Sequence, residues 1–129
     1  MVLKLIDATQ VRVGTIIMID NVPCTVKSID ISKAGKHGHA KARIEAVEIF
    51  AGRKKVLAIP GHERFEVPLV EKKKAQVLSI GDSTASVMDL ETYETIDIPF
   101  AKEIKEELAP EVQVEYWDIE GRKQIMRVI

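Results

Sequence analysis

The aliphatic side chains of this chain are mostly β-branched. It contains 14 Val and 16 Ile but only 7 Leu among its 129 residues. Val and Ile are stiff at χ1 and favour the extended backbone of a strand. Turn residues interrupt the apolar stretches at short intervals, as at Asp20-Asn21, Pro60-Gly61 and Glu120-Gly121. Many short strands separated by such turns predict a mainly β protein built from small barrels or sandwiches.

Charge divides the chain into two parts. Residues 1–70 carry 11 Lys and Arg against 7 Asp and Glu, a net charge of +4, whereas residues 71–129 carry 8 against 13, a net charge of −5. A proline and a charge cluster lie between the two parts, so we expect a linker near residues 69–73. Parts this small gain from closing into barrels that leave few strand edges. The chain therefore predicts two small β-barrels, residues 1–70 and residues 71–129.

The first part alternates like a set of paired strands. Its predicted strands are 14–19, 22–31, 40–46, 55–59 and 64–70. Within the third strand the apolar positions end at Ala46, and the next apolar residues, Val47 and Ile49, take the opposite phase. A phase change of one residue predicts a β-bulge or bend near Ala46.

The second part places a short helix among strands. The predicted strands are 75–80, 85–90, 92–99, 112–119 and 123–128, with a helix over 101–108 that ends before Pro110. Three strands, a helix and two strands is the order of a five-stranded Greek-key barrel of the OB type, which commonly binds oligonucleotides. A docking role is equally compatible with this fold, because fold alone does not establish function.

Several protein classes are excluded by composition. The mean hydropathy is −0.01, and no apolar run approaches the length that crosses a membrane. Residues 1–7 are interrupted by charge and precede no cleavage site, so they do not resemble a secretory signal. The one cysteine, Cys24, cannot form an internal disulfide and is expected to be a small core residue. We therefore expect a cytoplasmic protein with no membrane partner.

The segment from Ser32 to Lys41 contains no large apolar side chain. It reads SKAGKHGHAK and is predicted to form an exposed hairpin tip over residues 32–41. Gly35 and Gly38 bracket Lys36 and His37, which frees the backbone and leaves the lysine presented to a macromolecule. The basic residues around it suit phosphate. An ordinary solvated charged loop is the simpler alternative.

Spacing argues against other chemistries for this segment. Lys36 is followed by His37 where a P-loop needs Ser or Thr. The GxxG loop of a KH domain joins two helices, whereas this segment lies between two predicted strands, so a KH domain is also a poor match. His37 and His39 have no Cys, Asp or Glu neighbour within the loop to complete a metal site. Lys36 also lacks the apolar surroundings of a Schiff-base lysine. We expect no enzyme activity, no metal and no cofactor.

The ten residues from Ser32 to Lys41 resemble the modification loop of the translation initiation factor 5A family, whose members occur in archaea and eukaryotes and are related to bacterial elongation factor P. The resemblance covers the whole chain in domain order and implies an SH3-like barrel followed by an OB-fold. Eukaryotic members usually have Thr at the position of Ala34, and the chain is most similar to archaeal members.

The resemblance implies that Lys36 is the modified residue. In this family deoxyhypusine synthase attaches the aminobutyl group of spermidine to a lysine, giving deoxyhypusine or hypusine. The extended side chain enters the ribosome beside peptidyl-tRNA and supports peptide-bond formation, including at consecutive prolines. The resemblance also implies modification-loop or RNA-binding roles, on tRNA or ribosomal RNA, for the neighbouring residues Lys33, Gly35, His37, Gly38, His39, Lys41 and Arg43. Lys33, Lys41 and Arg43 could instead be ordinary solvated strand-end charges.

A general single-stranded RNA-binding protein acting through the second barrel is the alternative. That part of the chain has a net charge of −5, and its aromatic residues are few: Tyr93, Phe100, Tyr116 and Trp117. Stacking platforms for single strands combine aromatic side chains with a positive groove. The sequence therefore favours the modified translation factor over the general RNA-binding protein.

Overall fold

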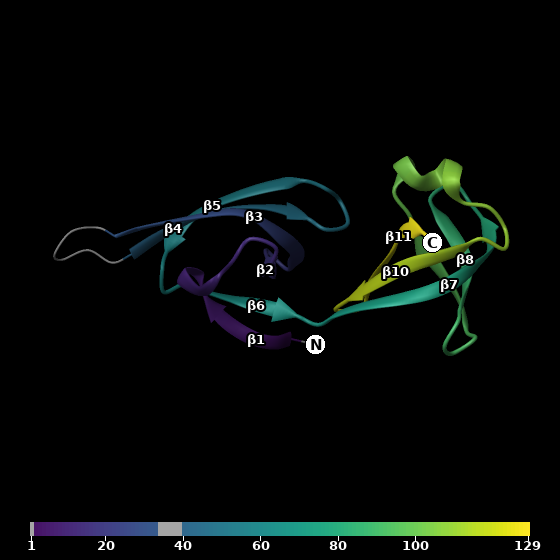
Figure 1. Ribbon diagram of the computed structural model, residues 1–129, viewed down its shortest axis with the longest axis horizontal. Helices are drawn as coiled ribbons and strands as arrows, with labels where there is room; N and C mark the ends of the chain where they lie inside the picture. Colours follow the sequence, from purple (N-terminus) through teal and green to yellow (C-terminus); the bar gives the residue numbers. More distant parts are fainter. Residues whose placement is uncertain (1, 34–39) are drawn as a thin grey trace. The chain divides into compact units, whose positions relative to one another are not determined.

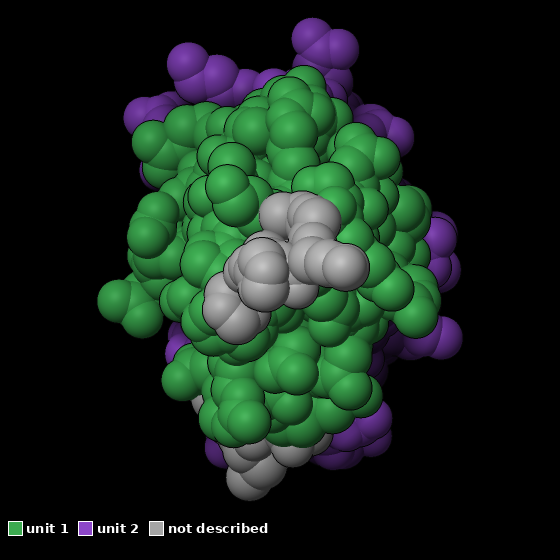
Figure 2. Space-filling view, turned by 90° about the vertical axis from the view of Figure 1, so that its left-hand side faces the viewer, with its two compact units in different colours: residues 1–69 green, residues 70–129 purple. Residues whose placement is uncertain are grey.

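A computed structural model of the chain describes residues 2–33 and 40–129. The chain forms two compact units, residues 1–69 and residues 70–129, which Figure 2 colours green and purple. The division falls one residue before the predicted boundary. Both units consist mainly of strands, so the prediction of a mainly β protein with two small domains is confirmed.

Unit 1 wraps two antiparallel sheets around one core (Figure 1). Its elements are β1 (Val2–Asp7), the 3₁₀ helix η1 (Ala8–Gln10), β2 (Ile16–Ile19), β3 (Val22–Lys33), β4 (Ala40–Glu48), β5 (Lys54–Pro60) and β6 (Arg64–Pro68). One sheet has the order β2-β3-β4-β5, and β1 pairs with β6 in the other. Strands β2 and β6 lie against each other. The fully buried side chains between the sheets include Val11, Ile17, Cys24, Val26 and Ile44.

A bulge is present beside Ala46, as predicted near Ala46 and Val47, but it lies in the partner strand and not in β4. Glu48 is buried at 5% exposure and continues the inward-facing alternation of Ala46, so β4 keeps its phase. A carboxylate can face inward here because Arg53 binds both of its oxygens, with N–O distances of 3.2 and 3.3 Å. The register shift lies in the neighbouring strand β3, between Val26 and Ser28. A polar residue on the buried face hid the alternation from the sequence pattern.

Unit 2 is a five-stranded antiparallel sheet that closes on itself. Its elements are β7 (Val70–Ile80), β8 (Thr84–Asp89), β9 (Thr95–Pro99), the 3₁₀ helix η2 (Lys102–Glu107), β10 (Gln113–Ile119) and β11 (Arg122–Val128). The sheet order is β11-β10-β7-β8-β9, and a parallel bridge from Phe100 to Ile125 joins its two ends. The enclosed core includes Val77, Val87, Ile98, Val114 and Tyr116.

Three local features differ from the sequence prediction. The prediction of a linker near residues 69–73 is wrong, because β6 ends at Pro68 and β7 begins at Val70. The predicted helix at 101–108 is present as the 3₁₀ helix η2. The strand β1 and the helix η1 are not among the predicted elements. Lys4 interrupts the apolar run of β1, so the local pattern does not indicate a strand. The partner strand β6 lies some sixty residues further along the chain, as the pair Asp7↔Arg64 shows.

A buried carboxylate organises the end of β8. Asp89 is 2% exposed and accepts hydrogen bonds from the Tyr116 hydroxyl and from the backbone N–H groups of Glu91, at 2.7 Å, and Thr92, at 3.0 Å. Burial raises the pKa of Asp89, but these hydrogen bonds outweigh burial and hold it below its ordinary value. The alternation of apolar residues does not indicate that this carboxylate is buried.

Candidate functional site

The predicted modification loop is carried by the hairpin of β3 and β4. The two strands pair from Cys24↔Glu48 to Lys33↔Ala40. Five predicted site residues lie outside the described residues: Gly35, Lys36, His37, Gly38 and His39. The other three, Lys33, Lys41 and Arg43, lie on the described ends of the two strands.

Lys33 and Lys41 present charge on both faces of the hairpin. Both side chains are exposed. Lys33 pairs with Ala40 and Lys41 pairs with Ser32, and neighbouring positions of a strand point to opposite faces. Within the described ranges 2–33 and 40–129, neither ammonium forms an ion pair. Both cations are therefore available to an anionic partner.

Arg43 is already engaged with the hairpin itself. Its Nη2 lies 3.3 Å from Oε1 of Glu45, which also lies 3.6 Å from the Lys54 ammonium, and Ser28 donates a hydrogen bond of 3.0 Å to Oε2. The Ser28 hydrogen bond and the nearby Lys54 and Arg43 charges lower the pKa of Glu45. Arg43 is a weaker candidate for a phosphate contact than Lys33 or Lys41, because it would have to leave this carboxylate.

A glycine in the β5–β6 turn fixes the start of β4. The N–H of Gly61 donates to the carbonyl of Ala40 at 2.7 Å. A Cβ at position 61 would lie 2.9 Å from Cγ2 of Thr9 and 3.1 Å from the carbonyl oxygen of Ala40. The turn and helix η1 therefore pack directly against the first residue of β4 and hold that end of the hairpin in place.

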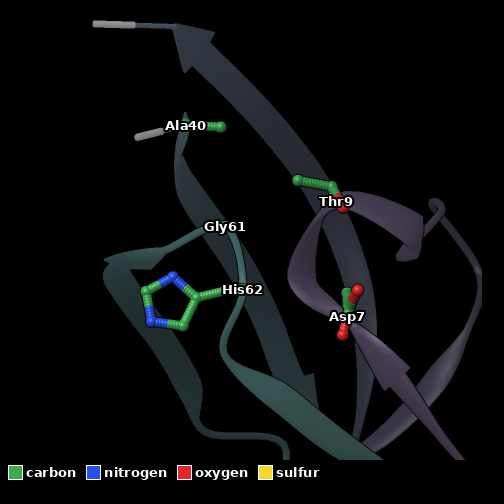
Figure 3. Close-up of a pocket in the computed structure, with 5 residues that line it drawn as sticks. All are labelled: Asp7, Thr9, Ala40, Gly61 and His62. Carbon is green, nitrogen blue, oxygen red and sulfur yellow. The ribbon is translucent and has the colours of Figure 1, made fainter. Parts of the chain in front are cut away.

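Beside this contact lies a recess of about 240 Å³. It is lined by Asp7, Thr9, Ala40, Gly61 and His62, with Asp7 and Thr9 on one side and the β5–β6 turn on the other (Figure 3). Its carboxylate is paired, because Oδ1 of Asp7 lies 3.3 Å from Nε of Arg64. The recess is not evident from the sequence, since its residues come from three separate segments.

The rest of the described chain offers little catalytic chemistry. Within residues 2–33 and 40–129, no three His, Cys, Asp or Glu side chains gather to hold a metal ion. Cys24 is fully buried, and burial raises the pKa of its thiol. This confirms Cys24 as a core residue. No helix in the described part is long and apolar enough to cross a membrane.

We expect Gly61→Ala to lower the stability of unit 1 by about 1–3 kcal/mol, because the new methyl group overpacks against Thr9 and Ala40. Thr9→Ser removes the methyl group nearest to the clash, so the double variant should recover part of the loss. Chemical denaturation followed by far-UV circular dichroism measures all three variants. Additive effects of the two substitutions would contradict a direct contact between these positions.

Two small β domains, the first with a basic hairpin and the second with the strand order of an OB barrel, define the class of protein. Residues 4–62 match the family model described as "Translation initiation factor 5A-like, N-terminal", and residues 69–128 match "Eukaryotic elongation factor 5A hypusine, DNA-binding OB fold". This is a two-domain translation factor.

Its relatives identify the particular family. The chain is 42% identical over 127 residues to translation initiation factor 5A of Pyrococcus horikoshii, covering 95% of this chain and 92% of the relative. It is 45% identical over 124 residues to the factor of Caldivirga maquilingensis, covering 94% of each chain. The solved structure of the Methanococcus jannaschii factor superposes with a TM-score of 0.84 at 42% identity, covering 98% of this chain and 94% of that one. The chain belongs to the translation initiation factor 5A family.

Proposed function

We propose that this chain acts on the ribosome beside peptidyl-tRNA and promotes peptide-bond formation, including at consecutive prolines, through Lys36 carrying deoxyhypusine or hypusine. The observation that carries the proposal is that residues 32–41 match the modification loop of the family. The family model that matches residues 69–128 also names hypusine in its description. The chain is then the substrate of deoxyhypusine synthase, works in the cytoplasm and needs no dissociable cofactor.

The described ends of the hairpin support this role. Lys33 and Lys41 are exposed cations on opposite faces of the two strands that lead to residues 34–39. Contacts of these two side chains with tRNA or ribosomal RNA phosphates would orient the hairpin, because phosphate contacts position a protein without selecting sequence. An added aminobutyl group gives Lys36 a second cationic amine and several ångströms of further reach.

The modification itself is the direct test. We expect protein from its native source to carry an added aminobutyl-type mass that peptide mapping assigns to Lys36, and protein made in a bacterial host to lack it. Intact-mass measurement of both samples, followed by fragmentation of the peptide that spans residues 34–40, checks this. An unmodified Lys36 in native-source protein, with the mass on another lysine, would overturn the assignment.

A further inference from the structure

One face of unit 2 combines cations with the chain's single tryptophan. The cross-strand pairs Lys72↔Trp117, Lys74↔Glu115 and Gln76↔Gln113 join β7 to β10, and Arg127 of β11 pairs with Glu115. Inward-facing neighbours such as Val114 and Tyr116 are buried, so these pairs point away from the core. We call the outward set Lys72, Lys74, Gln76, Gln113, Glu115, Trp117 and Arg127 the Trp117 face.

The Trp117 face is positive within an acidic unit. It holds three cations and one carboxylate. Residues 71–129 contain 8 Lys and Arg and 13 Asp and Glu, so outside this face 5 cations stand against 12 carboxylates. The net charge of the unit therefore conceals a local basic surface. A negative unit does not repel a polyanion equally from every side, because at physiological salt exposed charges are screened beyond about 8 Å.

The tryptophan is held in place by its neighbours. Its Nε1 donates a hydrogen bond of 2.9 Å to Oε1 of Glu115, whose Oε2 lies 3.2 Å from Nη2 of Arg127. The ammonium of Lys72 lies 4.6 Å from the centre of the indole ring. An exposed cation–π contact contributes only about 0.5–1 kcal/mol. Lys72 can therefore exchange the ring for a phosphate at low cost, which exposes the ring to a base.

The strands that usually bind oligonucleotides in an OB barrel are unsuited here. These are the second and third strands, β8 and β9 in this unit. Their outward pairs are Thr84↔Pro99, Ser86↔Asp97 and Met88↔Thr95, which contain a carboxylate but no cation and no aromatic ring. The Trp117 face, by contrast, presents three cations beside an aromatic ring.

We propose that the Trp117 face binds single-stranded RNA, with a base stacked on Trp117 and phosphates contacting Lys72 and Lys74. Stacking on tryptophan requires an unpaired base, because bases within a duplex are already stacked. The inference does not depend on the modification of Lys36. It adds a second contact with RNA, on a different domain from the hairpin.

Trp117 is the only tryptophan of the chain and reports directly on this surface. Full-length protein with unmodified Lys36 is titrated at physiological salt with a single-stranded oligouridylate of a dozen nucleotides, and the tryptophan emission is followed. We expect saturable quenching of the emission. Substituting both lysines, Lys72→Gln with Lys74→Gln, should raise the Kd from this signal about tenfold, since two phosphate contacts are lost.

The matched control removes the same charge from another part of the same unit. Lys102→Gln with Lys105→Gln alters two exposed lysines of η2, and should change the Kd less than twofold. An unchanged tryptophan emission with excess RNA, or an equal loss of affinity in both double variants, would overturn the proposal. Failure of this binding leaves the peptide-bond activity of modified protein untouched, so the two proposals are tested separately.

Discussion

Lys36→Arg is expected to abolish the stimulation of peptide-bond formation. Arginine keeps the positive charge and a similar length, but it lacks the primary amine to which the aminobutyl group is attached. A loop that acts only through its charge would tolerate this substitution. The measurement is peptide synthesis through consecutive prolines, with wild-type protein and the variant both treated with deoxyhypusine synthase and spermidine, and compared at equal ribosome occupancy.

The control for this experiment lies on the same hairpin. Lys33→Arg makes the same chemical change at an exposed lysine three residues away, which forms no ion pair within the described part of the chain. It should keep most of the activity, because either cation can donate hydrogen bonds to a phosphate. Both variants should unfold within about 0.5 kcal/mol of wild type, because Lys33 is exposed and the sequence predicts an exposed hairpin tip around Lys36. Equal stimulation by wild type and Lys36→Arg would show that the modified lysine does not carry the function.

The sequence predicted best what depends on neighbouring residues. The turns at Asp20-Asn21 and Glu120-Gly121 were predicted from composition, and both residues of each turn have positive φ, between 52° and 83°. This is the backbone of two-residue hairpin turns, which Asn, Asp and Gly tolerate best. The strands on either side followed from the same local alternation of apolar residues.

Features that depend on distant partners were mispredicted or missed. The charge of Glu48 made the inward-facing row of β4 seem to end at Ala46. The alternation of apolar residues does not show that Arg53 neutralises this buried carboxylate. The boundary between the units looked like a linker because Lys72 to Lys74 form a charge run. In the structure these lysines belong to β7, where Lys72 and Lys74 point outward beside Trp117 and Glu115. A run of charged residues can be a strand or a linker, and only its pairing with another strand, here β10, distinguishes the two.

The same limit applies to the candidate sites. The modification loop is a continuous motif, so a single segment of sequence was enough to propose it. The Trp117 face is assembled from β7, β10 and β11, and its lysines on β7 precede Arg127 of β11 by more than fifty residues in the chain. Net charge, which sums over the whole unit, argued against RNA binding there. The register of the strands reverses that argument, because it places three of the cations on one face beside a single carboxylate.

Asp89→Ala should be the most destabilising single substitution proposed for unit 2, at about 3 kcal/mol. It leaves the buried Tyr116 hydroxyl and two backbone N–H groups without their acceptor, and each unsatisfied buried group costs about 1–3 kcal/mol. For a domain of this size the melting temperature should fall by roughly 15 °C. Asp97→Ala, which removes an exposed carboxylate on β9, is the matched control and should cost less than about 1 kcal/mol.

The pH dependence of a third variant, Asp89→Asn, identifies the cause. Because the pKa of Asp89 is lowered on folding, its contribution is fully present above the ordinary Asp pKa of about 3.9 and is lost as the pH falls through the lower folded value. The difference in stability between wild type and Asp89→Asn should therefore be largest near neutral pH and shrink in acid. Tryptophan emission follows unit 2 alone, since Trp117 is the chain's only tryptophan. A difference that stays constant from neutral pH to below pH 3.9 would mean that packing, rather than the charge of Asp89, stabilises this turn.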